Sequence, residues 1–422
     1  MGSSLHARVL YTLGTMLSQR KLILGVTGSI AAYKSVYLLR RFQEARARVR
    51  VVLTRGATRF VGAMTFSAIT GERAVTDLLA GEAGTIPHVE LAHDADAVVI
   101  APTTADTLAR LASGRADDPV CALALATTKP LVIAPAMETG MWQNPATQAN
   151  VRVLVQRGAH LVMPAEGKLA SGHLGQGRMA EPDTILERVI WALTPNDLDG
   201  HRIVVTAGPT REHIDPVRFL SNRSSGKMGY AIAKVAARRG AKVHLISGPT
   251  ALRVPEGVRF TPIERTQDLL AACADAMADH TCLIMAAAPA DFAPAQFSPS
   301  KIKKNGLQND DHSRPALALT RTPDILTTLQ PLLKDKLVVG FAAESHDVET
   351  RARAKCQAKN LAFIIANDIT QTDGGFTTDT NTAIIIGRDG SCWRLPKLHK
   401  EALASEILDL VASASPHAAT SR

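Results

Sequence analysis

The sequence predicts an α/β protein built from two doubly wound, Rossmann-like domains, and three observations support this prediction. Short apolar runs alternate with amphipathic helical segments along almost the whole chain. Such alternation is typical of parallel sheets covered by helices on both faces. The length of 422 residues is enough for two domains with separate cores. The stretch LTPNDLDGH at 193–201 interrupts the pattern with turn-forming residues.

These observations divide the chain into five predicted segments. We expect an N-terminal extension at 1–20, a first domain at 21–193, a linker at 194–201, a second domain at 202–412 and a flexible tail at 413–422. The extension lacks a cleavage pattern after its apolar residues, so we interpret it as an arm and not as a signal peptide. The tail is small and polar, which favours fraying.

The first half contains four predicted strands, at 21–27, 49–54, 97–101 and 130–134, and an amphipathic helix follows the first of them. Ligands of doubly wound sheets lie beyond the carboxyl ends of the strands. Here those ends supply a glycine, small hydroxyl side chains and a methionine, namely Gly28, Ser29, Thr54, Thr103, Thr104 and Met137. Because such groups suit a phosphate with a ring beside it, we predict a mononucleotide site.

The second half repeats the alternation. Strands are predicted at 202–206, 242–246, 282–286, 337–341 and 361–366, followed by a hairpin of 383–386 with 392–395. A helix is predicted from Ser225 to a C-terminal cap at Gly240, because apolar residues recur at helical spacing between them.

A long polar loop between the first strand of this half and that helix is the most unusual stretch of the chain. It carries Arg211, Arg218, Asn222, Arg223 and Lys227. A loop between a strand end and a helix N-terminus suits an anion, since free backbone N–H groups and the helix dipole both face it. The loop fails the P-loop pattern, and no G-x-G-x-x-G follows the strand, which argues against an NAD-dependent Rossmann enzyme.

Two further groups of polar residues follow later strands. Asp291 comes directly after an apolar run, and Lys301, Lys303 and Lys304 cluster ten residues further on. Lys355 and Lys359 lie one helical turn apart. Lysines in such patterns are commonly solvated, but their position near strand ends also suits a triphosphate.

Composition narrows the possible partners. Lys and Arg number 48 against 39 Asp and Glu, giving a net charge of +9, while aromatic residues make up only 4%. No run interleaves basic and aromatic residues, so small phosphorylated ligands are favoured over nucleic acid. Five cysteines without a CxxC pair indicate neither a disulfide scaffold nor a zinc ribbon. No stretch approaches the ~20 apolar residues of a membrane span, so we expect no membrane partner and a cytoplasmic protein.

From Lys21 to Ala412 the chain resembles the fused bacterial family in which phosphopantothenoylcysteine decarboxylase is joined to phosphopantothenate–cysteine ligase. The resemblance is carried by TAGPTRE, DPVRFLSNRSSGKMG, AAAPADF, KIKK, TPDIL and VGFAAES in the second half, and by GVTGSIAAYK, HVELAHDAD, APTTAD and GQGRMAEP in the first. It implies a flavodoxin-like flavoprotein domain, then a ligase domain with an appended hairpin. It also implies a homo-oligomer with trimeric flavin domains and dimeric ligase domains.

For the second half, the resemblance implies a ligase that uses CTP and Mg²⁺ to join 4′-phosphopantothenate to cysteine through an acyl-cytidylate. Asn222 and Arg218 match residues of the acyl-cytidylate step, and Lys301 matches a lysine near the triphosphate. The metal ligands are not identified. The matched nucleotide contacts are Ala287, Asp291, Lys301, Pro323, Asp324, Ile325, Leu326, Phe341, Lys355 and Lys359.

For the first half, the resemblance implies FMN-dependent decarboxylation of phosphopantothenoylcysteine, with His88 as the catalytic histidine. Three positions depart from the family pattern. Glu138 replaces an asparagine that meets the substrate carboxylate, Ser171 replaces a proton-donating cysteine, and Asp117 replaces another asparagine. Like charges repel, and a hydroxyl is a weaker acid than a thiol, so we expect weak or lost decarboxylation. Two alternatives remain open: a non-catalytic FMN-binding scaffold, or a decarboxylase whose Glu138 contacts an amine or amide of another substrate.

Overall fold

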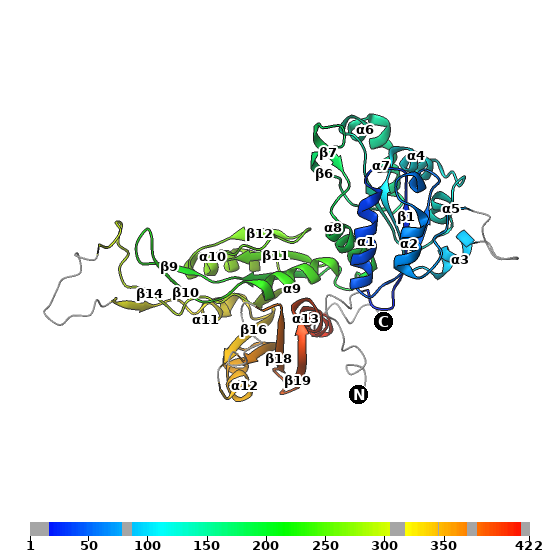
Figure 1. Cartoon of the computed structure of the whole chain (residues 1–422). Coiled ribbons are helices and arrows are strands. Elements are labelled where there is room, and N and C mark those ends of the chain that lie inside the picture. Colours follow the sequence, from blue (N-terminus) through cyan, green and yellow to red (C-terminus); the bar gives the residue numbers. More distant parts are fainter. Residues whose placement is uncertain (1–16, 78–86, 304–316, 345, 369–377, 415–422) are drawn as a thin grey trace. The chain divides into compact units, whose positions relative to one another are not determined.

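The computed structural model describes residues 17–77, 87–303, 317–344, 346–368 and 378–414. The chain divides into two compact units, and the boundary between them falls between Thr194 and Pro195 (Figure 1). Residues 1–16 of the predicted extension, Lys304 and the tail from 415 lie outside the described residues. Within the described ranges, no helix is both long and apolar enough to cross a membrane.

The N-terminal unit is built on a five-stranded parallel sheet in the order β2-β1-β3-β4-β5. This is the flavodoxin-like order, so the predicted fold class is confirmed. The four predicted strands are present, and the short fifth strand was not predicted. The strands are β1 (Lys21–Val26), β2 (Arg48–Leu53), β3 (Ala97–Thr103), β4 (Leu131–Pro135) and β5 (His160–Leu161).

Helices pack on both faces of this sheet because its strands are apolar on both sides. Leu24 and Val99 belong to the core that includes Phe42 of α1, whereas Ile23 and Val98 belong to the second core. The helices of this unit are α1 (Ala32–Glu44), α2 (Ala63–Thr70), α3 (Pro87–Asp94), α4 (Ala105–Ser113), α5 (Pro119–Ala126), α6 (Thr139–Gln143), α7 (Pro145–Gln156) and α8 (Pro182–Leu193), with a 3₁₀ turn η2 (Ala57–Arg59). A separate antiparallel hairpin joins β6 (Ala165–Lys168) to β7 (Leu174–Arg178).

The C-terminal unit contains an eight-stranded sheet in the order β12-β11-β8-β13-β16-β17-β18-β19. The first six strands are parallel and follow the Rossmann order, and β18 and β19 form the predicted antiparallel hairpin. The strands are β8 (Arg202–Ala207), β11 (Lys242–Ser247), β12 (Arg259–Pro262), β13 (Cys282–Met285), β16 (Leu337–Glu344), β17 (Phe363–Asp368), β18 (Thr380–Gly387) and β19 (Cys392–His399).

Five α-helices of this unit lie within the described residues, and α9 begins at Lys227, two residues later than the sequence predicts. They are α9 (Lys227–Arg238), α10 (Thr266–Met277), α11 (Ile325–Leu329), α12 (Val348–Ala358) and α13 (Lys400–Ala414), with a 3₁₀ turn η4 (Gln330–Leu332). Two short antiparallel pairs, which the sequence did not predict, follow β8 and β13 in the chain. They are β9 (Arg211–His213) with β10 (Phe219–Ser221), and β14 (Phe292–Pro294) with β15 (Leu319–Arg321).

A buried histidine pair near the edge of this sheet predicts acid sensitivity. His244 is 4% exposed, its ring centroid lies 5.7 Å from that of His280, and its Nε2 lies 2.8 Å from Thr261 Oγ1. Burial, with Arg259 and His280 adding repulsion, lowers the pKa of His244 from 6.5 to about 4. In the unfolded chain His244 therefore takes up a proton near pH 6.5, whereas in the folded chain it does so only near pH 4. We expect this residue to cost roughly 3 kcal/mol of stability as pH falls through that window. Calorimetry at pH 7.5, 6 and 5 checks this, and a wild-type pH slope in His244→Gln would contradict it.

Candidate functional site

The N-terminal unit has a cavity at the topological switch point of its sheet. The chain leaves β1 toward β2 on one side and later reaches β3 on the other, so the carboxyl ends of β1 and β3 open onto a crevice. The cavity measures about 1090 Å³. Five of the six predicted cofactor residues line it, namely Gly28, Ser29, Thr54, Thr104 and Met137.

Thr103 is the exception among the predicted cofactor residues. Its side chain is fully buried, and its hydroxyl donates to the carbonyl of Ile100 at 2.7 Å. Thr104, the next residue, caps α4 by accepting from Thr107 N at 3.2 Å, and its own N–H donates to Thr27 Oγ1. The cavity therefore meets the start of α4 through Thr104, while Thr103 supports the strand end behind it.

Gly28 is required by a close approach of two chain segments. A Cβ at this position would lie 3.0 Å from the carbonyl carbon of Gly56, which is backbone and has no flexible end. The turns after β1 and β2 consequently meet without side chains between them. This leaves their backbone and the Ser29 and Thr54 side chains facing the cavity, a lining that suits a phosphate.

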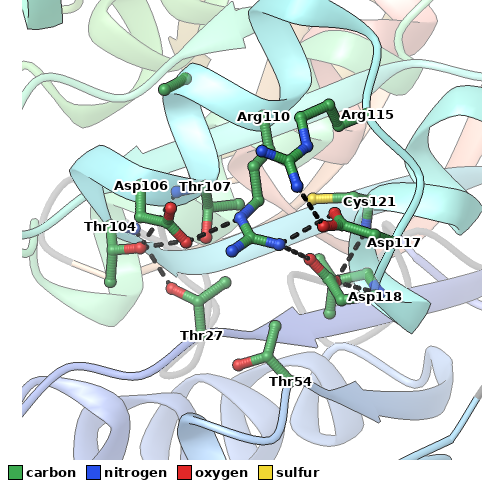
Figure 2. A network of polar contacts seen from close by, with 12 residues as sticks. Thr27, Thr54, Thr104, Asp106, Thr107, Arg110, Arg115, Asp117, Asp118 and Cys121 are labelled. Atoms are coloured by element: carbon green, nitrogen blue, oxygen red, sulfur yellow. Dashed lines mark hydrogen bonds and ion pairs between the residues drawn. The ribbon is translucent and has the colours of Figure 1, made fainter.

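A network of charged side chains forms another wall of the cavity (Figure 2). Arg110 donates to Asp106 Oδ2 and to Asp117 Oδ1, both at 2.8 Å, and lies 3.9 Å from Asp118 Oδ2. Asp117 also accepts from Arg115 at 2.6 Å. Although partial burial opposes it, hydrogen bonding to Arg115 and the nearby arginine charges lower the pKa of Asp117. Asp117 replaces an asparagine of the family pattern, and its negative charge is therefore balanced by Arg110 and Arg115.

Glu138 and Ser171, the other two departures, both line the same cavity. Glu138 follows β4 and caps α6 by accepting from Gly140 N, and its Oε1 lies 3.7 Å from Nδ1 of His173. Ser171 lies between β6 and β7. The structure thus brings together two residues that are 33 positions apart in the sequence, beside the predicted cofactor residues.

The β6–β7 hairpin closes on this region through Gly177. A Cβ there would lie 2.3 Å from the carbonyl oxygen of Met137, in a direct backbone contact. We expect Gly177→Ala to displace the hairpin and to lower copurification of the FMN that the family resemblance implies, measured by absorbance near 450 nm. Gly172→Ala is the matched control, since Gly172 also has a positive φ of 88° but no atom within 4 Å of the place where a Cβ would lie. The control should cost only roughly 1–2 kcal/mol, the strain of alanine in a left-handed conformation. Equal flavin content in both variants would contradict the prediction.

His88 lies on α3, outside the residues that line this cavity. It borders a much smaller void with Asp77 and Pro119, and its buried Nδ1 has no hydrogen-bond partner among the described residues. Within one chain, the structure therefore does not join His88 to Glu138 and Ser171. Its predicted catalytic role stays a prediction.

The C-terminal unit has its own switch point between β8 and β13. The turns after these strands are joined by a hydrogen bond from Ala288 N to Gly208 O at 2.9 Å, and Ala287 N donates to Thr206 Oγ1 at 3.1 Å. Asn222 follows β10 and donates its side-chain amide to Ala288 O at 3.3 Å and to Pro289 O at 2.9 Å. Asn222 thereby fixes the turn that leads to Asp291.

A chain of contacts extends from this turn through the other predicted nucleotide residues. Thr322 N donates to Asp291 O at 3.1 Å, which places the start of the 322–326 segment beside the turn. Asp324 caps α11 and forms an ion pair with Lys359, and Lys355 donates to Phe341 O at 3.2 Å. Despite partial burial, hydrogen bonds from Lys359 and Thr327 lower the pKa of Asp324. Ile325 is 4% exposed and belongs to the core, so its side chain faces away from a ligand.

Arg218 and Lys301 form a second group on the same unit. Arg218 immediately precedes β10, its side chain is 47% exposed, and its Nη1 donates to Ile302 O at 3.2 Å. Lys301 is exposed and adjacent to Ile302. The two predicted cations therefore lie on segments that are in direct contact, although they are 83 positions apart in the sequence.

Sequence reasoning missed several residues that the structure places at these sites. Arg110 was not singled out, although it lines the first cavity and binds three carboxylates. Asp215 was also missed, although it contacts Arg218. The Asp-Pro pairs at 118–119 and 215–216 were the available signal, because they favour caps and turns.

The fold and these residues define a protein of two doubly wound α/β domains, each with a group of polar residues at its switch point. The chain matches the Flavoprotein family over residues 10–194 and the DNA/pantothenate metabolism flavoprotein C-terminal domain over 198–414. The chain belongs to the family of bifunctional coenzyme A biosynthesis proteins, and it is an enzyme.

Two relatives that match almost the whole chain support this membership. The coenzyme A biosynthesis bifunctional protein CoaBC of Bacillus subtilis (strain 168) is 41% identical over 405 residues, covering 95% of this chain and 98% of the relative. The protein of the same name from Mycobacterium bovis is 43% identical over 412 residues, covering 93% and 96%. A crystal structure of the C-terminal domain of a CoaBC protein is 41% identical, covers 52% of this chain and 97% of that chain, and has a TM-score of 0.44.

Proposed function

We propose that the C-terminal unit is a CTP- and Mg²⁺-dependent ligase that joins 4′-phosphopantothenate to cysteine. The observation that carries the proposal is the run of contacts at the Rossmann switch point, from Asn222 through the 287–291 turn to Asp324 and Lys359. Residues that the resemblance assigns to one reaction thus lie along one connected edge of the sheet. The name of the relatives, a bifunctional protein of coenzyme A biosynthesis, supports the same interpretation.

The reaction needs activation because a carboxylate is a poor electrophile. A carboxylate oxygen of phosphopantothenate attacks the α-phosphorus of CTP, and pyrophosphate leaves. The cysteine amine then attacks the acyl carbon, loses a proton and displaces CMP. Arg218 and Lys301 supply positive charge for the anionic phosphates, where fixed cations stabilise developing charge.

Magnesium would reach this site with the nucleotide. Among the described residues, no group of three or more His, Cys, Asp or Glu side chains is arranged to hold a metal ion. Mg²⁺ commonly binds through substrate phosphates with only one or two protein carboxylates. Asp291 is exposed beside the turn at the switch point and is our candidate for such a carboxylate.

The ligase proposal predicts that the C-terminal unit is active as a fragment. The fragment should begin at Pro195, because Asp197 forms an ion pair with Arg239 at 2.7 Å and Leu198 N donates to Arg239 O at 2.8 Å. We expect it to release pyrophosphate from CTP only when Mg²⁺ and phosphopantothenate are present. A folded fragment without CTP turnover, beside an active full chain, would contradict this prediction. A fragment from Asp199 is the comparison and should be less stable.

We further propose that the N-terminal unit binds FMN. The cavity is large enough, and the Gly28–Gly56 approach with Ser29, Thr54 and Thr104 suits the phosphate. When bound, FMN would supply the oxidant for the substrate's cysteine side chain, which is the change that precedes loss of CO₂. Purified protein should be yellow and release FMN on denaturation, and a colourless protein that binds no added FMN would contradict the proposal.

For the decarboxylase activity itself, we propose that it is weak toward phosphopantothenoylcysteine. Glu138 places a carboxylate in the cavity, and Ser171 places a hydroxyl where a thiol would donate a proton. An FMN-binding scaffold, or a decarboxylase for a substrate with an amine or amide end, remains the alternative. A homo-oligomer stays part of the proposal, to be measured by light scattering of the full chain.

A further inference from the structure

We propose that Asp215 is a positioning residue that holds Arg218 and the Lys301 segment together as one cationic clamp. This inference rests on the proposed ligase function, because the clamp matters only if those cations meet anionic substrates. Asp215 touches no solvent and hence no ligand, since its side chain is 0% exposed. It acts through the residues that it binds.

The carboxylate of Asp215 accepts hydrogen bonds from two separate segments. Oδ1 accepts from the backbone N–H groups of Val217 and Arg218, both at 2.8 Å. Oδ2 accepts from Arg218 Nη1 and from Ile302 N, both at 3.2 Å. One oxygen thus shapes the β9–β10 turn, and the other joins that turn to the segment beginning at Lys301.

Further contacts support the same junction. Arg218 Nη1 also donates to Ile302 O at 3.2 Å, so the guanidinium bridges the Asp215 carboxylate and the Ile302 carbonyl. Ser298 N donates to Ile214 O at 3.0 Å, and Ile214 N donates to Arg218 O at 2.9 Å. The two segments are therefore aligned over several residues, with Asp215 at the centre of the alignment.

The junction between the β9–β10 turn and the Lys301 segment depends on the negative charge of Asp215. Burial opposes that charge, but hydrogen bonds from Val217, Ile302 and Arg218 outweigh it and lower the pKa of Asp215. A charged acceptor forms stronger hydrogen bonds than a neutral one. A buried N–H group that loses its acceptor is costly, so the segments would move apart without the carboxylate. Arg218 and Lys301 would then lose their fixed separation, although both side chains would remain.

The test compares two substitutions that remove different parts of the junction, in the full-length protein. Asp215→Asn keeps the size but turns one acceptor oxygen into a donor. Asp215→Ser keeps an oxygen that can accept from the turn N–H groups two and three residues on, but is too short to reach Ile302. We expect both variants to lower kcat/KM for Mg²⁺-dependent pyrophosphate release from CTP by on the order of 10- to 100-fold, as a misplacement of about 1 Å does. We also expect faster hydrogen exchange at the amide of Ile302.

Glu401→Gln is the matched control for general destabilisation. Glu401 is also a buried carboxylate of this unit, and it accepts from Arg238 at 2.7 Å and Lys234 at 2.9 Å between α9 and α13. This variant should lower thermal stability without changing kcat/KM or exchange at Ile302. Because exchange is measured without substrate, it reports on the clamp even in a protein with no ligase activity.

The outcomes separate the two proposals. If the wild type releases no pyrophosphate from CTP, the proposed ligase function is contradicted. In that case, slow hydrogen exchange at Ile302 in the wild type and fast exchange in Asp215→Ser still support the positioning role of Asp215. If the wild type is active and Asp215→Ser keeps wild-type kcat/KM and wild-type exchange, the positioning role is overturned. Should Asp215→Asn fail to fold, Asp215→Ser decides the question, because it retains the turn.

Discussion

Replacing Asn222 by Asp is expected to lower kcat/KM for the ligase reaction by on the order of a hundredfold or more, with little loss of folded protein. The two amide protons of Asn222 are directed at the carbonyls of Ala288 and Pro289. A carboxylate of the same size has no protons to donate and repels both carbonyl oxygens. It also adds negative charge beside anionic substrates. Displacing the 288–291 turn by about 1 Å is expected to cost on the order of a hundredfold in rate.

The measurement is steady-state pyrophosphate release with CTP and phosphopantothenate, with circular dichroism to confirm folding. Asn196→Asp provides the control, since it makes the same chemical change at an exposed position of the same unit away from the switch point. The control should keep wild-type kinetics. Wild-type turnover in Asn222→Asp would remove Asn222 from the site.

The second large effect is expected in the N-terminal unit, where two substitutions should restore decarboxylation only in combination. Glu138→Asn removes the charge that opposes the substrate carboxylate and retains a cap for α6, because asparagine is among the preferred N-cap residues. Ser171→Cys supplies a group acidic enough to donate a proton. The two changes act at different steps, so neither alone should give phosphopantetheine.

Release of CO₂ and formation of phosphopantetheine are measured for the four variants with FMN content matched. We expect little or none of either product from the wild type and from Ser171→Cys, CO₂ with little phosphopantetheine from Glu138→Asn, and both products from the double variant. Ser171→Ala in the Glu138→Asn background tests whether a thiol is needed at position 171. It should give the same products as Glu138→Asn alone, which keeps Ser171. Robust phosphopantetheine production by the unmodified protein would overturn this interpretation. Asp117 should not limit recovery, because Arg110 and Arg115 balance its charge.

The sequence by itself determined the fold class and the identity of most strands. Buried parallel strands are continuous apolar runs, and runs such as KLILGV and RIVVTA need no tertiary information to be recognised. The motifs also determined which residues to consider, since Asn222, Arg218, Lys301, Glu138 and Ser171 all stand in recognisable patterns. The short pairs β9–β10 and β14–β15 could not be predicted in this way. Three residues are too few for a period-two pattern, and these strands pair outside the main sheets.

Only the tertiary structure decided which of those residues meet. Strand order places each switch point, and that order depends on long-range packing that a local pattern does not encode. For that reason Thr103 proved to support the strand while Thr104 lines the cavity, and His88 lies apart from Glu138 and Ser171. The role of Asp215 was hidden for the same reason. Its acceptor Oδ2 binds Ile302, 87 residues away, and a contact at that separation exists only once both segments have been folded against each other.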